Sequence, residues 1–265
     1  MIYVTGDTHA RPIQRILERV RKNPYPGNNL TEDDILIIAG DFGYLWFPPD
    51  HRDYALLESE LDALNAMPFT ILFLDGNHEN FDRLDALPTI KKYRGTVGVV
   101  RDKIFHLRRG ECYIINDKKI LTIGGGISVD KAQRVKGVSW WERENISLQE
   151  IERAMFNVYD NKQEFDYIIT HTGPRSIIDN FFSHLHPIDR MRASYPGADR
   201  MYDPTAAFLE ELYVKHIKKY RGWFFAHLHM ESHLQTRGIY GKNKSPRIVS
   251  IMESVLPITF FEKPV

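Results

Sequence analysis

The sequence has little that would support several common classes of protein. A single cysteine among 265 residues excludes an intramolecular disulfide and a thiolate metal cluster, so any bound metal must be held by nitrogen and oxygen. Basic and acidic residues balance at 35 each, which leaves no overall charge to attract nucleic acid or an anionic membrane. No apolar run approaches the roughly 20 residues of a membrane-spanning helix. The opening MIYVTGDTHA also lacks the basic and apolar parts of a secretory signal, so we expect a cytoplasmic protein without a membrane partner.

What is present is enough apolar sequence for a large core, with 43% hydrophobic residues. Short runs rich in Ile, Val and aromatic residues are closed by turn-forming polar residues, a pattern typical of buried strands. Apolar residues at helical spacing, or capping signals, lie between several of them. Strands are expected over residues 2–5, 35–39, 69–74, 120–123, 167–170 and 223–226. Helices are expected over residues 12–20, 57–64, 147–158 and 203–212.

The middle of the chain differs, because four apolar runs follow one another closely at residues 97–100, 104–107, 112–115 and 120–123. We expect them to form an antiparallel meander, continued in style by residues 247–252 and 258–261. Since no linker or repeat divides the chain, we expect one α/β domain over residues 1–265, containing two sheets. Two long loops, residues 126–145 and 183–202, are expected to act as lids or binding loops.

Five of the apolar runs end in side chains that can bind metals, in the segments GDTH, GDFG, DGNHE, HTGP and HLHM. The carboxyl ends of strands in open α/β sheets converge on a common crevice, so these side chains are expected to meet. Two carboxylates and several imidazoles crowded together need a cationic partner, which two divalent metals would supply. Imidazole, carboxylate and amide ligands favour Mn, Fe, Zn, Co or Ni. The residues are Asp7, His9, Asp41, Asn77, His78, His171, His227 and His229.

The spacing within two of these segments supports a shared pocket. Asp7 and His9 are two residues apart, as are His227 and His229, so in extended backbone both members of a pair project to the same face. Glycines precede Asp7, Asp41 and Asn77 and permit tight turns with close approach of the backbone.

The ordered series GDTH, GDFG, GNHE, THTGP and AHLH resembles the signature blocks of the calcineurin-like metallophosphoesterase superfamily, and GGISVDKAQR with SWWERE resembles its small bacterial and phage members. The resemblance implies a four-layer α/β/β/α sandwich of two mixed sheets, with a two-metal site at the C-terminal ends of the strands. Manganese is the favoured metal. Ala226 stands where the family usually has glycine. By motif, the first metal would be held by Asp7, His9 and His229, the second by Asn77, His171 and His227, and both by Asp41.

This arrangement predicts a two-metal-dependent hydrolase of phosphomonoesters or phosphodiesters. Two metals about 3.5–4 Å apart can share a water and lower its pKa toward about 7, which provides a hydroxide nucleophile. By analogy His78 would be the catalytic group that protonates the leaving oxygen, while Asn77 and Arg134 would contact the substrate phosphate. A solvated loop arginine is an equally good interpretation of Arg134. Asp75 and Glu79, beside the GNH turn, suit hydrogen bonding or capping better than ligation.

Several alternatives stay open at this point. A small phosphate ester or nucleotide is favoured as substrate, with a manganese-dependent nuclease as the second enzymatic hypothesis. The basic residues between positions 91 and 109 would suit a polyanion, although such a run is more typical of a solvated face. A non-catalytic metal-binding interaction module on the same fold is the third hypothesis. Adjacent Trp140 and Trp141 would either stack on a base or pin their loop to the core. The sequence carries no signal for an oligomeric state.

Overall fold

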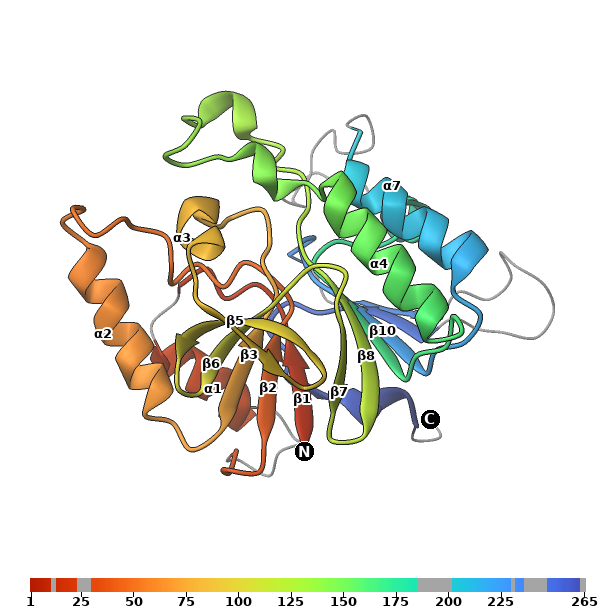
Figure 1. Cartoon of the computed structure of the whole chain (residues 1–265), viewed down its shortest axis with the longest axis horizontal. Coiled ribbons are helices and arrows are strands. Elements are labelled where there is room, and N and C mark those ends of the chain that lie inside the picture. Colours follow the sequence, from red (N-terminus) through yellow and green to blue (C-terminus); the bar gives the residue numbers. More distant parts are fainter. Residues whose placement is uncertain (11–12, 23–29, 185–201, 230–231, 236–246, 263–265) are drawn as a thin grey trace.

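The computed structural model describes residues 1–10, 13–22, 30–184, 202–229, 232–235 and 247–262, and contains two mixed sheets (Figure 1). Within these residues, the first sheet has seven strands in the order β13-β1-β2-β3-β6-β5-β4, with β1, β2, β3 and β6 parallel. The second has six in the order β11-β12-β10-β9-β8-β7, with β12, β10, β9 and β8 parallel. The strands are β1 (Ile2–Thr5), β2 (Ile35–Ile38), β3 (Thr70–Phe73), β4 (Thr89–Lys92), β5 (Gly95–Arg101), β6 (Ile104–Leu107), β7 (Cys112–Ile115), β8 (Lys118–Ile123), β9 (Tyr167–Thr170), β10 (Gly222–Phe225), β11 (Ser232–Gln235), β12 (Arg247–Ser250) and β13 (Leu256–Pro257).

Two of the helices, α4 and α7, begin where local capping predicts. Ser147 and Glu150 form the expected capping box at the start of α4, and Asp203 accepts hydrogen bonds from the backbone of Thr205 and Ala206 ahead of Pro204 in α7. The helices are α1 (Ile13–Lys22), α2 (Tyr54–Asn65), α3 (Phe81–Asp85), α4 (Leu148–Asp160), α5 (Arg175–His184) and α7 (Pro204–Glu211), with short turns η1 (Lys131–Gln133), η2 (Glu142–Glu144), η4 (Leu212–His216) and η5 (Ile258–Glu262). None of the helices in the described ranges is long and apolar enough to cross a membrane.

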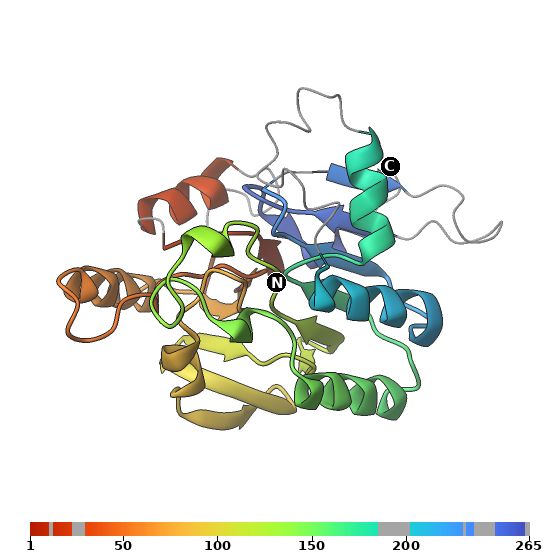
Figure 2. The same cartoon turned by 90° about the horizontal axis from the view of Figure 1, so that it is seen from above.

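Three buried clusters show the four expected layers. One lies between the two sheets and joins Val4, Ile37 and Leu72 of the first sheet to Ile169 and Phe224 of the second. Another packs the outer face of the first sheet against α1 and α2, and the third packs the outer face of the second sheet against α4, α5 and α7. Seen from above, these two groups of helices lie on opposite sides of the molecule (Figure 2). The α/β/β/α sandwich is therefore confirmed.

The expected antiparallel meander is wrong. β5 pairs with β6, and β7 with β8, as two separate hairpins that belong to different sheets. Each hairpin is completed by a parallel neighbour, because β6 pairs with β3 and β8 pairs with β9. The chain thus crosses from one sheet to the other between Leu107 and Cys112, where the sequence shows only a short polar turn.

Two further expectations, both for the C-terminal part of the chain, are wrong. Residues 258–261 form the 3₁₀ turn η5 instead of a strand, and β12 pairs in parallel with β10 and antiparallel only with β11. The 126–145 loop contains η1 and η2, whereas most of the expected 183–202 loop lies outside the described residues, as does Pro12. The carboxyl ends of β1, β2 and β3 meet those of β8, β9 and β10 at one edge, where the polar segments follow.

Candidate metal centre

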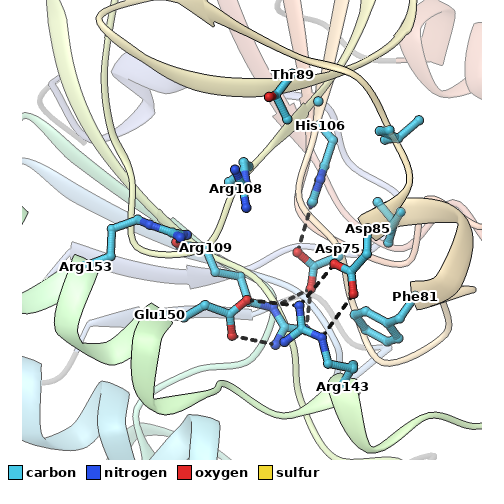
Figure 3. A pocket seen from close by; sticks show the side chains of 13 residues that line it. Asp75, Phe81, Asp85, Thr89, His106, Arg108, Arg109, Arg143, Glu150 and Arg153 are labelled. Atoms are coloured by element: carbon cyan, nitrogen blue, oxygen red, sulfur yellow. Dashed lines mark hydrogen bonds and ion pairs between the residues drawn. The ribbon is translucent and has the colours of Figure 1, made fainter.

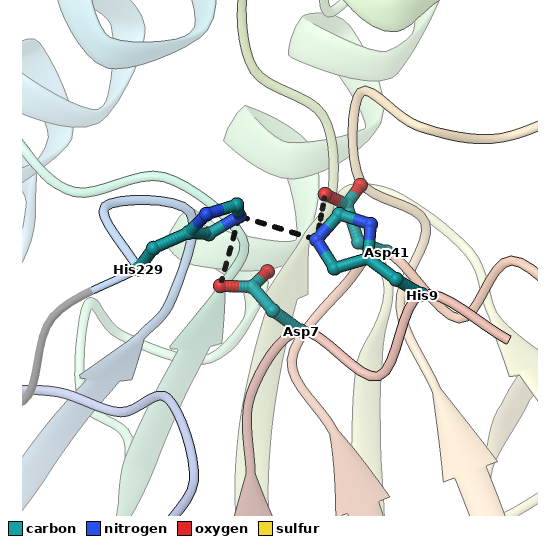
Figure 4. Close-up of side chains that lie close together, drawn as sticks. All are labelled: Asp7, His9, Asp41 and His229. Carbon is teal, nitrogen blue, oxygen red and sulfur yellow. Dashed lines mark hydrogen bonds and ion pairs between the residues drawn. The ribbon is translucent and has the colours of Figure 1, made fainter. Parts of the chain in front are cut away.

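Four of the expected ligands form a compact group at this edge (Figure 4). One ligand atom from each of Asp7, His9, Asp41 and His229 can be chosen so that all lie within 4.8 Å of one another. The Nε2 atoms of His9 and His229 are 3.1 Å apart, and His9 Nε2 lies 3.4 Å from Asp41 Oδ2. His229 Nε2 is 4.0 Å from Asp7 Oδ2. These atoms point toward a common centre, as the ligands of a metal ion do.

The backbone at these residues is not extended, contrary to the expectation that spacing in extended chain would align each pair. The φ angles are 25° at Asp7, 47° at His9, 50° at Asp41, 67° at His227 and 52° at His229, all in the left-handed region. Non-glycine residues occupy this region rarely and at a cost, and such residues concentrate at functional sites. The side chains converge because each chain turns sharply just past its strand.

Buried polar contacts hold these turns in place. The Arg19 guanidinium of α1 is only 8% exposed and donates to the carbonyl oxygens of Gly6, at 2.7 Å, and Asp7, at 3.3 Å. The His9 backbone N–H donates to Asp41 O at 2.7 Å, and the Thr8 hydroxyl to the same oxygen at 3.3 Å, which ties the β1 turn to the β2 turn. Sequence reasoning missed Arg19, although its place three residues after buried Ile16 put it beside the apolar stripe of the helix.

A second group of acceptor atoms lies on the other side of Asp41. His171 is fully buried, and its Nδ1 lies 2.9 Å from Ala39 O, so that Nδ1 carries a hydrogen and Nε2 is the ring nitrogen left to bind a metal. This Nε2 lies 3.0 Å from Asn77 Oδ1 and 3.6 Å from Asp41 Oδ1. The Asn77 amide nitrogen donates instead to Ser128 Oγ at 3.0 Å. Two oxygen acceptors and the His171 Nε2 atom therefore face one another, an arrangement that suits a bound cation.

His227 lies beside this second group. Its ring centroid is 4.8 Å from that of His171, and its backbone N–H donates to Asp7 Oδ2 at 3.1 Å. Burial lowers the pKa of His227, so the imidazole is neutral at pH 7 and suited to ligation.

The two carboxylates have divergent proton affinities. Burial, together with the charge of Asp41, raises the pKa of Asp7 to about 7. Burial also raises the pKa of Asp41, but the attraction of His171, His78 and His9 outweighs it and leaves that pKa below its usual value. Burial lowers the pKa of His9 to about 4. The group thus presents an ionised Asp41 and a neutral His9 imidazole to a cation, while Asp7 is partly protonated near pH 7 and a metal can displace its proton.

The donor set fits divalent metals. Asp7 Oδ1 and Asp41 Oδ2 are buried carboxylate oxygens that accept no hydrogen bond from the described residues. Leaving a buried charged group unsatisfied is expensive, and a metal bound by these oxygens removes the cost. Asp7 and Asp41 each contribute one of these oxygens, and both carboxylates lie between the imidazoles. The oxygens without a hydrogen bond therefore lie where metal ions would be held.

Glycines allow the ligands to approach one another. A Cβ at Gly40, whose φ is +98°, would lie 2.0 Å from His171 Nδ1, and one at Gly76 would lie 2.0 Å from Asp41 Oδ1. The methyl group of Ala226 is accommodated because it faces Gly6, where a Cβ would come within 2.9 Å of it. The departure from the family pattern at Ala226 therefore has a local compensation.

Two buried acids fix the loops under the site, as the sequence suggested for them. The Glu79 carboxylate accepts from the backbone N–H groups of Phe42, at 2.6 Å, and Gly43, at 3.2 Å, directly after Asp41. Asp75 accepts from Arg109 Nε at 2.6 Å and lies 3.0 Å from His106 Nε2 (Figure 3). Arg109 is 3% exposed, so the expectation of a solvated basic face is wrong at this residue.

His78 and Arg134 form a pair at the rim of the site. The His78 backbone N–H donates to Asp41 Oδ1 at 2.8 Å, and its Nε2 lies 3.3 Å from an Arg134 amino group. Arg134 also donates to Asp130 at 2.8 Å and to Ser139 O at 3.1 Å. Burial and the Arg134 charge lower the pKa of His78. Arg134 is thus held against the site and is not a free solvated arginine.

The structure brings together all nine residues that the sequence singled out, although they come from six loops. Trp141 is 6% exposed and donates to Asp82 at 2.9 Å, so it pins the 126–145 loop to α3.

A family model described as calcineurin-like phosphoesterase matches residues 1–231, which include every candidate ligand. The chain belongs to the calcineurin-like phosphoesterase family. Members of this family use divalent metals, in agreement with the donor set above. A lariat debranching enzyme of Schizosaccharomyces pombe is 26% identical over 208 residues, which is 74% of this chain but 42% of that protein. This chain therefore matches less than half the length of that relative.

Among solved structures, the calcineurin-like phosphoesterase YfkN of Bacillus subtilis is similar over 94% of this chain and 80% of its own, with 15% identity and a TM-score of 0.39.

Proposed function

We propose that this calcineurin-like phosphoesterase is a two-metal-dependent hydrolase of phosphomonoesters or phosphodiesters. The observation that carries the proposal is the pair of orphaned buried carboxylate oxygens among neutral imidazoles. Asp41 faces both ligand groups and would be shared between two metals, with manganese favoured. When bound, the metals would supply an activated water as nucleophile and offset the charge of the phosphate oxygens. The first metal would be held by Asp7, His9 and His229, and the second by Asn77, His171 and His227.

The protein's own groups would orient the ester and handle its proton. Arg134 cannot accept a hydrogen bond, so His78 Nε2 faces it with a lone pair and the imidazole is neutral. A phosphate entering beside the metals would draw the Arg134 guanidinium to its oxygens, aided by the Asn77 amide. His78 Nε2 would then be free to take up a proton from solvent and pass it to the leaving oxygen.

Hydrolysis of a chromogenic phosphomonoester and of the matching diester in Mn²⁺ tests this function. We expect the wild type to hydrolyse at least one ester, and Asp41→Asn to abolish both metal retention and turnover. Full activity of Asp41→Asn would overturn the assignment of that residue.

A manganese-dependent nuclease is the second candidate function, supported by the similarity to a protein named as a lariat debranching enzyme. Incubation with single-stranded and branched oligonucleotides in Mn²⁺ tests it. Cleavage that Asp41→Asn abolishes would favour this candidate, whereas intact oligonucleotides beside rapid hydrolysis of small esters would reject it.

A further inference from the structure

A cavity of about 590 Å³ lies beside the candidate site. Its three walls are the segment that follows Asp41 (residues 45–51), the α3 region and the 137–139 segment of the 126–145 loop. Figure 1 shows this loop above α3. Pockets of this size class hold small organic ligands.

The cavity adjoins the residues proposed for catalysis. The three segments that form its walls follow β2, β3 and β8 in the chain. Asp41, His78 and Arg134 follow the same three strands. Ser139 lines it and accepts from the Arg134 guanidinium, whose other amino group lies 3.3 Å from His78. Asn80, another lining residue, follows His78 by two positions. A phosphate ester held at the metals would therefore have its alcohol part beside the cavity.

The cavity walls are fixed by hydrogen bonds before any ligand enters. Asn80 Nδ2 donates to Trp46 O at 2.9 Å, and Arg83 donates to Phe47 O at 2.8 Å, which ties the 45–51 segment to α3. The Trp141 indole, packed edge-on against Trp46 at 5.8 Å, ties the 126–145 loop to Asp82. A preformed cavity binds a ligand without first ordering its own walls.

The lining favours an uncharged planar group. Trp46, Phe47 and Val138 supply apolar and aromatic surface, and the His51 ring stacks on Phe47 with centroids 4.1 Å apart and planes 2° from parallel. The one arginine of the lining is already paired, since Arg83 binds Glu58 at 2.9 Å, and an Asp82 carboxylate oxygen accepts from the Trp141 indole. An anionic group would therefore find no free countercharge among the lining residues named here.

We propose that this cavity binds an uncharged aromatic ring carried by the ester's alcohol part, so that the substrates are nucleoside or other aryl phosphates. This inference rests on the proposed function for its substrate, but the binding of the ring itself does not. Stacking on aromatic side chains and exclusion of water would supply the selectivity.

Val138→Asp is the decisive variant, and Val135→Asp is its matched control. Both valines are exposed, at 66% and 61%, and lie on the same loop, but only Val138 lines the cavity. Hydrolysis rates are measured for a nucleoside phosphate, a phenyl phosphate and a glycerol phosphate. Each is used as the monoester or as the diester, according to which form the wild type hydrolyses. We expect Val138→Asp to lower kcat/KM at least about tenfold, or about 1.4 kcal/mol, for the two ring-bearing esters alone. Val135→Asp should match the wild type on all three.

Binding of the ring is measured separately on the protein as purified, by titrating adenosine and phenol and following tryptophan fluorescence. We expect both ligands to quench the tryptophan fluorescence and Val138→Asp to weaken their binding. Trp46→Phe keeps an aromatic ring but removes this fluorophore, so it should diminish the quenching. A preference for the nucleoside ester over the phenyl ester would identify a nucleobase, and the reverse a simple aryl group.

Two failures are distinguishable. If no ester is hydrolysed but adenosine or phenol still binds and Val138→Asp weakens that binding, the cavity proposal is supported and the proposed function is wrong. If glycerol phosphate is hydrolysed as well as the ring-bearing esters and Val138→Asp changes none of them, the cavity proposal is overturned while the proposed function stands.

Discussion

Replacing Arg109 by methionine tests how the loops beneath the site are held together. The buried guanidinium donates to Asp75 Oδ2 at 2.6 Å and lies 3.4 Å from Glu150 (Figure 3). It also donates to Asn145 O at 2.8 Å and to Glu144 O at 3.1 Å. It thus joins the strand end before the GNH turn to the loop that carries Arg134. Methionine has a similar length but donates no hydrogen bonds.

The expected cost is large because Asp75 would be left buried without its main counter-charge. Removing one partner of a buried ion pair costs about 3–5 kcal/mol of unfolding free energy. Arg143→Met is the matched control from the same pocket, since Arg143 is 42% exposed, pairs with the exposed Asp85 at 3.1 Å and lies 3.5 Å from Glu150. An exposed pair of this kind contributes about 0–1 kcal/mol.

The pH dependence of the Arg109→Met effect gives a second check. Burial raises the pKa of Asp75, but the adjacent Arg109 and His106 outweigh it and lower that pKa below its ordinary value of 3.8. An acid whose pKa is lowered by folding stabilises the fold above its unfolded pKa and loses this contribution as the pH falls through the folded value. The difference in stability between wild type and Arg109→Met should therefore be largest near neutral pH and shrink as the pH falls toward the lowered pKa of Asp75 in the wild type.

Urea unfolding at a series of pH values measures both effects. We expect Arg109→Met to lose several times more stability than Arg143→Met at pH 7, and Asp75→Asn added to Arg109→Met to recover part of the loss. Equal losses for the two single variants, or a loss that does not change with pH, would refute the reasoning.

Three further predictions concern the site itself. His78→Ala should lower turnover about 10²–10⁴-fold while Mn²⁺ content stays unchanged; unimpaired turnover would remove His78 from the chemistry. Gly40→Ala should destabilise the chain and weaken Mn²⁺ binding, because its Cβ would lie 2.0 Å from His171 Nδ1. Gly137 also has a positive φ but faces open space, so Gly137→Ala should leave Mn²⁺ binding intact. Equal Mn²⁺ affinities of the two variants would contradict the steric argument. Because the pKa of Asp7 is raised to about 7, Mn²⁺ must displace its proton below that pH, so the affinity should fall as the pH drops through 7. Calorimetry in buffers of different ionisation enthalpy measures the released proton, and an affinity independent of pH would count against this role of Asp7.

The sequence predicted the strands that carry the site because each is a short apolar run with a polar end. The runs that became β1, β2, β3, β9 and β10 were recognisable within a few residues, and parallel strands necessarily gather their carboxyl ends at one edge. The sequence therefore predicted that Asp7 and His229 lie close together, although they are far apart in the chain.

The assignment of hairpins to sheets was not predictable in the same way. Pairing of β5 with β6, and of β7 with β8, is encoded by neighbouring residues, but membership of a sheet depends on β3 and β9, which lie far away in sequence. The same limit hid Arg109, whose partners Asp75 and Glu150 are 34 and 41 residues distant.

The left-handed backbone at the ligands was also beyond sequence reasoning. Asp7 and His9 were expected in extended chain, yet their φ angles are held positive by contacts from Arg19 and from the turn at Asp41. These contacts are tertiary, so no local propensity encodes them.

Anomalous diffraction from crystals grown in Mn²⁺ tests the central claim most directly. The account predicts two manganese peaks about 3.5–4 Å apart. One should lie among Asp7, His9 and His229, and the other among Asn77, His171 and His227, with Asp41 between them. A single peak, or peaks away from these side chains, would contradict the two-metal site.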